Sequence, residues 1–82
     1  MNVNVRYFAA ARAAAEIDGE TVTLAPDATV ADLVAALRTR GDKLSTVLDR
    51  CSFLCDEIAV RDMTKTLETN QTVDVLPPFA GG

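Results

Sequence analysis

The sequence predicts an α+β domain in which a mixed β-sheet is covered on one face by one main α-helix plus short helices. Segments near both ends of the chain, residues 3–8 and 72–76, alternate apolar and polar residues as half-buried strands do. Between them, residues 30–37 carry an apolar stripe with helical spacing. A length of 82 residues gives room for one domain with one modest core.

The first strand is predicted by the segment VNVRYF. Val3, Val5 and Tyr7 share one face and are expected in the core, whereas Arg6 and Phe8 share the other face. The segment AAARAAAE then predicts a short helix, and the turn signal Asp18-Gly19 leads into a second strand, ETVTLA, with alternating Val22 and Leu24.

The main helix has start and stop signals. Thr29 and Asp32 form a capping-box pattern in which Asp replaces the usual Glu, and Gly41 is expected to end the helix in a left-handed conformation. Its apolar stripe comprises Val30, Leu33, Val34 and Leu37. This stripe should lie across the sheet.

The second half of the chain predicts one short helix and three strands. The stripe Leu44, Val47, Leu48 and Cys51 has helical spacing, with Cys51 as its last position. Two brief strands, SFLC and EIAV, flank Asp56-Glu57, and a connection follows with a turn at Asn70-Gln71. TVDVLPP is the last strand, which stops pairing at its prolines.

Alternation in the first and last strands leaves two large apolar side chains on the uncovered face of the sheet. Val73 and Val75 face the core, so Leu76 points outwards, as Phe8 does. Clustered exposed apolar side chains mark contact surfaces. Whether Phe8 and Leu76 cluster depends on the two strands being neighbours.

Composition argues against several partners. Eight basic and twelve acidic residues give a net charge of −4, which repels nucleic acid and anionic membranes. The first residues show no signal-peptide pattern and no run reaches the length of a membrane span, so we expect a cytoplasmic protein. With no histidine and two cysteines, a metal site is not expected, and Cys51 is interpreted as a buried small apolar residue.

The last six residues suggest a chemical function. We expect residues 1–76 to form the domain and residues 77–82 a flexible tail of about 20 Å at about 3.3 Å per residue. Pro77 and Pro78 favour an extended base, and Phe79 offers an apolar anchor. Gly81 and Gly82 lack side chains and can enter a narrow channel.

In this interpretation the reactive group is the Gly82 carboxylate. A carboxylate acylates poorly until ATP converts it to an acyl-adenylate, which a sulfur nucleophile can turn into a thiocarboxylate. The sequence has no phosphate-binding loop and no histidine, so a separate enzyme must use the ATP. The chain itself is expected to bind no cofactor.

The C-terminal LPPFAGG, supported by RYFAAAR near the N-terminus, resembles the ubiquitin-like β-grasp sulfur carriers, in particular the small subunits of molybdopterin synthase. The resemblance implies that an E1-like enzyme adenylates Gly82 and that a sulfur donor protein supplies the thiocarboxylate sulfur. The tail, including Ala80, then enters the large catalytic subunit of a heterotetramer and sulfurates the cyclic pyranopterin precursor in molybdenum cofactor biosynthesis. It also implies that Phe8 and Leu76 contact the partner.

The sequence departs from this family in places. Asp56-Glu57 stands where the family often has asparagine, Cys55 is unusual there, and Phe79 is bulkier than the residue common at its position. Arg12 matches a family arginine but equally suits a solvated charge. Alternative functions are a sulfur carrier for thiamin thiazole or cysteine synthesis, a ubiquitin-like modifier of lysines, and an interaction domain with inert glycines.

Overall fold

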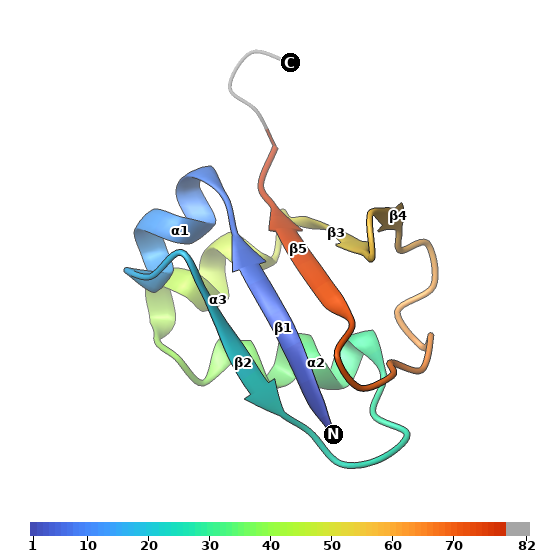
Figure 1. Cartoon of the computed structure of the whole chain (residues 1–82). Helices are drawn as coiled ribbons and strands as arrows, with labels where there is room; N and C mark the ends of the chain where they lie inside the picture. Colours follow the sequence, from blue (N-terminus) through green and yellow to red (C-terminus); the bar gives the residue numbers. More distant parts are fainter. Residues whose placement is uncertain (79–82) are drawn as a thin grey trace.

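The fold is a mixed five-stranded sheet with three helices, seen in a computed structural model that describes residues 1–78 (Figure 1). The strand order is β2-β1-β5-β3-β4. The strands are β1 (Asn2–Tyr7), β2 (Gly19–Thr23), β3 (Ser52–Cys55), β4 (Ile58–Ala59) and β5 (Thr72–Leu76). The central strands β1 and β5 are parallel and the other pairs are antiparallel, which confirms the predicted α+β architecture.

Three helices lie on one side of this sheet (Figure 1). They are α1 (Ala9–Ala15), α2 (Val30–Arg38) and α3 (Asp42–Leu48). The apolar stripe of α2 is buried against the sheet as predicted, and Val3, Val5 and Tyr7 are buried opposite it. None of the helices in the described part of the chain has the length and apolar character needed to cross a membrane.

The start of α2 is capped as the sequence predicts. The Thr29 hydroxyl accepts from the Asp32 N–H at 3.2 Å, and the Asp32 carboxylate accepts from the Thr29 N–H at 2.9 Å. The next two N–H groups, of Val30 and Ala31, donate to carbonyls in the connection before β5, at 3.0 and 2.9 Å. These bonds satisfy donors that a helix start would otherwise leave free.

The prediction that Gly41 terminates α2 is wrong. The helix ends at Arg38, and its C-cap is Thr39, whose backbone stays right-handed and whose hydroxyl donates to the Ala36 carbonyl at 2.6 Å. Gly41 instead precedes α3 with φ of 151°, a region that disfavours side chains. A tight connection between two helices therefore uses the glycine where a helix stop was expected.

The prediction that Cys51 is the last helical position of its stripe is also wrong, because α3 ends at Leu48. The chain then turns, so the Cys51 N–H donates to the Leu48 carbonyl at 3.2 Å and the Cys51 thiol to the Val47 carbonyl at 3.2 Å. Cys51 is half-buried against the core, which fits its interpretation as a small apolar residue.

The connection between β4 and β5 contributes more than the sequence indicated. Leu67 is buried in the core, and Thr66 forms a bridge with Thr29 at the start of α2. Asn70 has a φ of 66°, which confirms the predicted turn. A segment read as a surface connection therefore closes one end of the core.

Candidate functional site

The face of the sheet away from the helices brings together the outward residues of the first and last strands. Because β1 and β5 are parallel neighbours, Arg6 pairs with Asp74 and Tyr7 with Val75. The next positions along this register are Phe8 and Leu76. The alternation pattern did not determine whether the first and last strands are neighbours, and the fold shows that they are.

Phe8 is one of four large apolar residues exposed on the described chain, with 37% of its surface accessible. Its backbone is still extended, and its N–H donates to the Val75 carbonyl at 3.2 Å before α1 begins. Leu76 is half-buried and therefore less exposed than Phe8. Together the two side chains give this end of the face an apolar character.

Next to Phe8, an ion pair joins the two central strands. Arg6 donates to both carboxylate oxygens of Asp74, at 2.6 and 2.8 Å. Asp74 is only 5% exposed, and the hydrogen bond to it raises the Arg6 pKa. The Arg6 guanidinium also lies 5.7 Å from the centroid of the Phe8 ring, within cation–π range. The Asp74 carboxylate therefore has its partner within the sheet, and Arg6 is held by two neighbours, Asp74 and Phe8.

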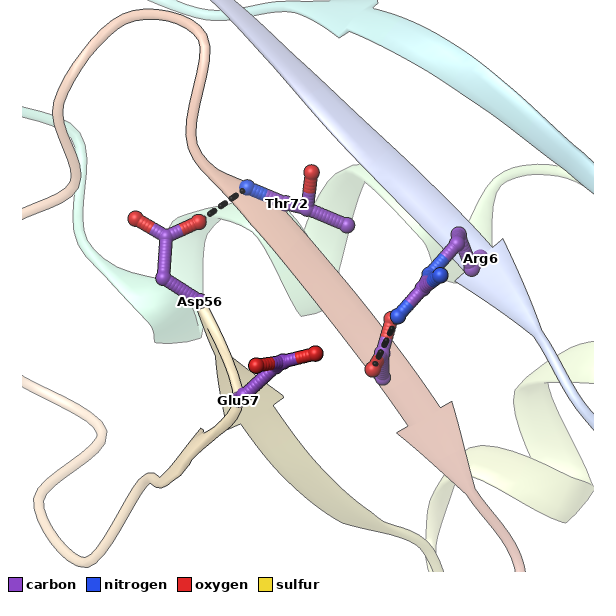
Figure 2. Close-up of a pocket in the computed structure, with 5 residues that line it drawn as sticks. Arg6, Asp56, Glu57 and Thr72 are labelled. Atoms are coloured by element: carbon purple, nitrogen blue, oxygen red, sulfur yellow. Dashed lines mark hydrogen bonds and ion pairs between the residues drawn. The ribbon is translucent and has the colours of Figure 1, made fainter.

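A pocket of about 360 Å³ opens beside this ion pair (Figure 2). It is lined by Arg6, Asp56, Glu57, Thr72 and Asp74. Three carboxylates against one guanidinium leave the pocket net negative.

The acidic side of the pocket comes from the turn between β3 and β4. Two residues, Asp56 and Glu57, connect the paired Cys55 and Ile58, and both have positive φ, 48° and 70°. Positive φ at both central residues is the geometry of a type I′ turn, which suits the right-handed twist of a hairpin.

Asp56 fastens this turn to β5. Its N–H donates to the Thr72 carbonyl at 2.8 Å, and its carboxylate accepts from the Thr72 N–H at 2.9 Å. Glu57 is exposed, and its carboxylate points toward β5 (Figure 2). Neither Asp56 nor Glu57 forms an ion pair within residues 1–78.

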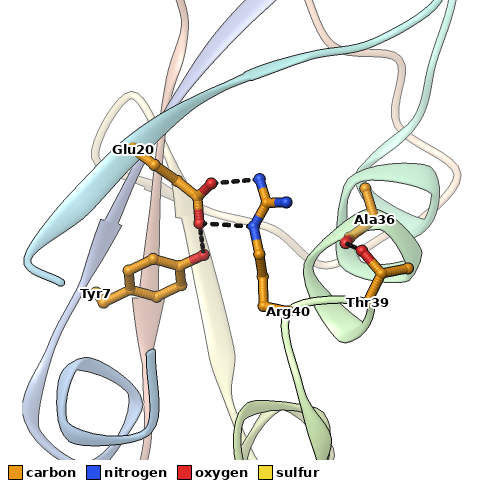
Figure 3. A network of polar contacts seen from close by, with 5 residues as sticks. All are labelled: Tyr7, Glu20, Ala36, Thr39 and Arg40. Carbon is orange, nitrogen blue, oxygen red and sulfur yellow. Dashed lines mark hydrogen bonds and ion pairs between the residues drawn. The ribbon is translucent and has the colours of Figure 1, made fainter. Parts of the chain in front are cut away.

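The strands that carry the site are braced by a second polar network (Figure 3). The hydroxyl of buried Tyr7 donates to the Glu20 carboxylate at 2.6 Å, and Arg40 donates to both oxygens of the same carboxylate. Burial, and then this hydrogen bond, raises the Tyr7 pKa. Burial alone would raise the Glu20 pKa, but the bonds from Arg40 and Tyr7 outweigh it and hold that pKa below its usual value.

Only the base of the predicted tail belongs to the described chain. Pro77 is buried on the domain and Pro78 is exposed, so the accessible part of the tail begins one residue later than predicted. Phe79, Ala80, Gly81 and Gly82 lie outside the described residues. Their expected roles stay predictions.

Other residues singled out in the sequence lie away from the pocket. Arg12 is exposed and 3.8 Å from Asp18, as a solvated charge would be. Cys55 is buried and Cys51 half-buried, both are free thiols, and burial raises the pKa of each. Within residues 1–78 there is no group of three side chains able to hold a metal ion.

Sequence reasoning missed the Arg6–Asp74 pair. Alternation placed Arg6 on the face of Phe8 and Asp74 on the face of Leu76, which is correct. The pair becomes evident only when the two strands are aligned in parallel at the observed register. That register was the missing information.

Comparisons with known proteins place this geometry in context. A model of the ThiS family matches residues 5–82. The molybdopterin synthase sulfur carrier subunit of Chlamydomonas reinhardtii is 31% identical over 83 residues, covering 100% of both chains. The putative molybdopterin converting factor subunit 1 of Pyrococcus furiosus has a TM-score of 0.87 and 26% identity, over 96% of this chain and 99% of that one. A chain in the complex of molybdopterin-converting factor subunits 1 and 2 from Helicobacter pylori has a TM-score of 0.76 and 21% identity, covering 100% of both, and shows the same fold.

Proposed function

The chain belongs to the ThiS family, and from this premise we propose that it is the sulfur-carrier small subunit of a molybdopterin synthase. The observation that carries the proposal is the Chlamydomonas sulfur carrier subunit, which matches this chain at 31% identity from end to end. The similarity of the whole fold to a molybdopterin converting factor subunit supports the same function.

The proposed chemistry takes place on the carboxylate of Gly82. An E1-like enzyme lets this carboxylate attack the α-phosphorus of ATP, so that pyrophosphate leaves and an acyl-adenylate forms. Hydrosulfide supplied through a donor protein then displaces AMP and gives the thiocarboxylate. The thiocarboxylate sulfur then displaces an oxygen substituent from a carbon of the cyclic pyranopterin precursor, and water cleaves the resulting thioester, which leaves the sulfur on the precursor and restores the carboxylate. The chain binds no cofactor in this scheme, and ATP belongs to the activating enzyme in the cytoplasm.

The proposed acceptor is the large catalytic subunit of the synthase, in a heterotetramer. Gly81 and Gly82 would enter its active site, with Pro78, Phe79 and Ala80 along the entrance. Phe8 and Leu76 would contact its surface, because they lie at the end of the open face from which β5 continues into the tail. Pro77, which is buried, would hold the base of the tail in place.

The test is the mass of the tryptic peptide from Thr66 to Gly82, taken from the native cell with the sulfur pathway active. This peptide contains no Met or Cys, so oxidation of side-chain sulfur cannot imitate an exchange of oxygen for sulfur. We expect a fraction of the peptide to carry that exchange at Gly82.

The same measurement separates the alternatives. A Gly82 carboxyl joined to lysine would make the chain a protein modifier, and a peptide that is always a plain carboxylate would favour an inert interaction domain. A thiocarboxylate accompanied by copurifying thiamin or cysteine synthesis enzymes would change the acceptor. As a control, one residue added after Gly82 should abolish the exchange and leave the thermal unfolding curve unchanged.

A further inference from the structure

We propose that the acidic pocket on the open face of the sheet receives a basic side chain of the large synthase subunit, with Asp56 and Glu57 as its counter-charges. This inference rests on the proposed function and deepens it, because it assigns a charge to the partner surface. The pocket would then decide which large subunit the carrier accepts.

The pocket shares strand β5 with the residues that lead into the tail. Strand β5 contributes Thr72 and Asp74 to the pocket and Leu76 beyond it on the same face. The same strand continues directly through Pro77 and Pro78 into the tail (Figure 1). A partner that holds Gly82 and contacts Phe8 and Leu76, as proposed above, therefore also meets this face.

The charges of the pocket are only partly compensated within the domain. Arg6 uses two donors on Asp74, so this pair is internally balanced. Asp56 and Glu57 have no ion-pair partner among residues 1–78. Covering two such carboxylates with an apolar or acidic surface would remove their water without replacement, which is unfavourable. A partner surface that brings a cation replaces this water favourably.

The shape of the face suits one side chain set beside an apolar contact. A volume of about 360 Å³ is near the lower end of the roughly 300–1,000 Å³ typical of ligand pockets, but those are mostly apolar whereas this lining is mostly charged. Phe8 stacks on Arg6 at the edge of the pocket, so the apolar and acidic parts of the face are continuous. An aromatic anchor bordered by charged contacts is the usual composition of a protein interface.

The residue types in the turn between β3 and β4 also support a role for Glu57 in binding. A two-residue turn with positive φ at both positions strongly prefers Asn-Gly or Asp-Gly. This chain has Glu57 at the second position, with φ of 70° and a side chain directed at β5 (Figure 2). Glycine would adopt this backbone conformation with less strain, so the turn geometry does not explain why this position carries a carboxylate.

The experiment measures binding of the full-length chain to the recombinant large subunit of the same organism by isothermal titration calorimetry. The test variant is Asp56→Asn with Glu57→Gln, which removes both negative charges and keeps side-chain size. We expect Kd to rise about tenfold at low salt, as for loss of a close interfacial charge pair. The wild-type Kd should also increase more steeply with salt than that of the variant.

Two controls make the result specific. Asp42→Asn with Asp49→Asn changes the net charge equally at and just after α3, which covers the opposite face, and should leave Kd unchanged. Phe8→Ala should weaken binding with little change in its salt dependence. A test variant that binds like wild type, or no more weakly than the α3 control, overturns the inference while leaving the sulfur-carrier function intact. A wild-type chain that never binds the large subunit overturns both.

Discussion

Among single residues, Asp74 and Glu57 show two ways in which a carboxylate is fixed on the open face. Asp74 is buried, and its carboxylate is fixed by two hydrogen bonds from Arg6. Glu57 is exposed, and its position is fixed by the backbone of a tight turn. Asp74 therefore stabilises the sheet, whereas Glu57 remains accessible to a binding partner.

Replacing Glu57 by glycine should stabilise the domain. A residue other than glycine in the left-handed region costs about 1–2 kcal/mol, and Glu57 has a φ of 70°. We therefore expect Glu57→Gly to raise the free energy of unfolding by about 1 kcal/mol in urea titrations. The matched control is Glu68→Gly, where φ is not positive and stability should fall. Equal losses in both variants would contradict the strain argument.

Among the elements, the pair β1–β2 shows how side chains and backbone together hold an edge of the sheet. Tyr7 and Arg40 meet on Glu20, so one carboxylate joins β1, β2 and the chain after α2 (Figure 3). Gly19, at the start of β2, lies against the backbone of Val5. The same end of the strand pair, at the start of β2, thus depends both on the charged contacts of Glu20 and on the absence of a side chain at Gly19.

The Glu20 network should make stability depend on acid pH. The pKa of Glu20 is lower in the folded than in the unfolded chain. The stability that Glu20 contributes is therefore fully present above the unfolded pKa of about 4.5 and is lost as pH falls through the folded pKa. Glu20→Gln should lower the free energy of unfolding by about 1–3 kcal/mol at pH 7, as expected when charged hydrogen bonds are lost.

The difference between wild type and Glu20→Gln should then shrink steadily below pH 4.5 in unfolding curves recorded at several pH values. Glu16→Gln, an exposed carboxylate at the end of α1, serves as the control. A wild-type-to-variant gap that is the same at pH 7 and pH 3 would contradict the assignment.

Gly19→Ala should weaken the β1–β2 pair. A Cβ at this position would lie 2.5 Å from the Val5 carbonyl oxygen, which is backbone and cannot rotate away. We expect a loss of about 1–3 kcal/mol in the free energy of unfolding, in the range found for overpacking. Thr21→Ala, at an exposed position of the same strand, should change stability by less. A Gly19→Ala variant as stable as wild type would show that the strand shifts without loss of stability.

For the molecule as a whole, the first and last strands lie side by side in the middle of the sheet, and one core spans all three helices. The segments most distant in sequence are therefore in direct contact. A small domain with a single core of this kind is expected to unfold in one cooperative step.

Cys55 offers a probe of that step. It is buried on β3, and burial raises its thiol pKa, so it should react with a thiol reagent only when the domain opens. In a Cys51→Ser variant, whose hydroxyl can still donate to Val47, labelling should be slow in buffer and follow the urea unfolding curve seen by circular dichroism. Fast labelling under native conditions would indicate local opening of β3 instead.

Much of the fold was predictable because local patterns are short-range properties of the chain. Alternation identified β1 and β5, and the stripe of α2 with its Thr29–Asp32 cap identified the main helix. Signals at the connections were less certain. Gly41 follows the main helix as a stop signal would, although it is the N-cap of α3, and no pattern predicts that Leu67 is buried, because Leu67 stands outside any periodic segment.

By itself, the sequence determined which side chains of β1 and β5 face the core and which face outward, since alternation depends only on the pleat of each strand. It also supplied the tail chemistry proposed for Gly82. Only the tertiary structure decided that these strands are parallel neighbours, which brings Arg6 onto Asp74 and Phe8 beside Leu76. The tertiary structure also decided that Asp56 and Glu57 line the same pocket as this pair. Strand order and register are set by contacts between distant segments, which no local pattern specifies.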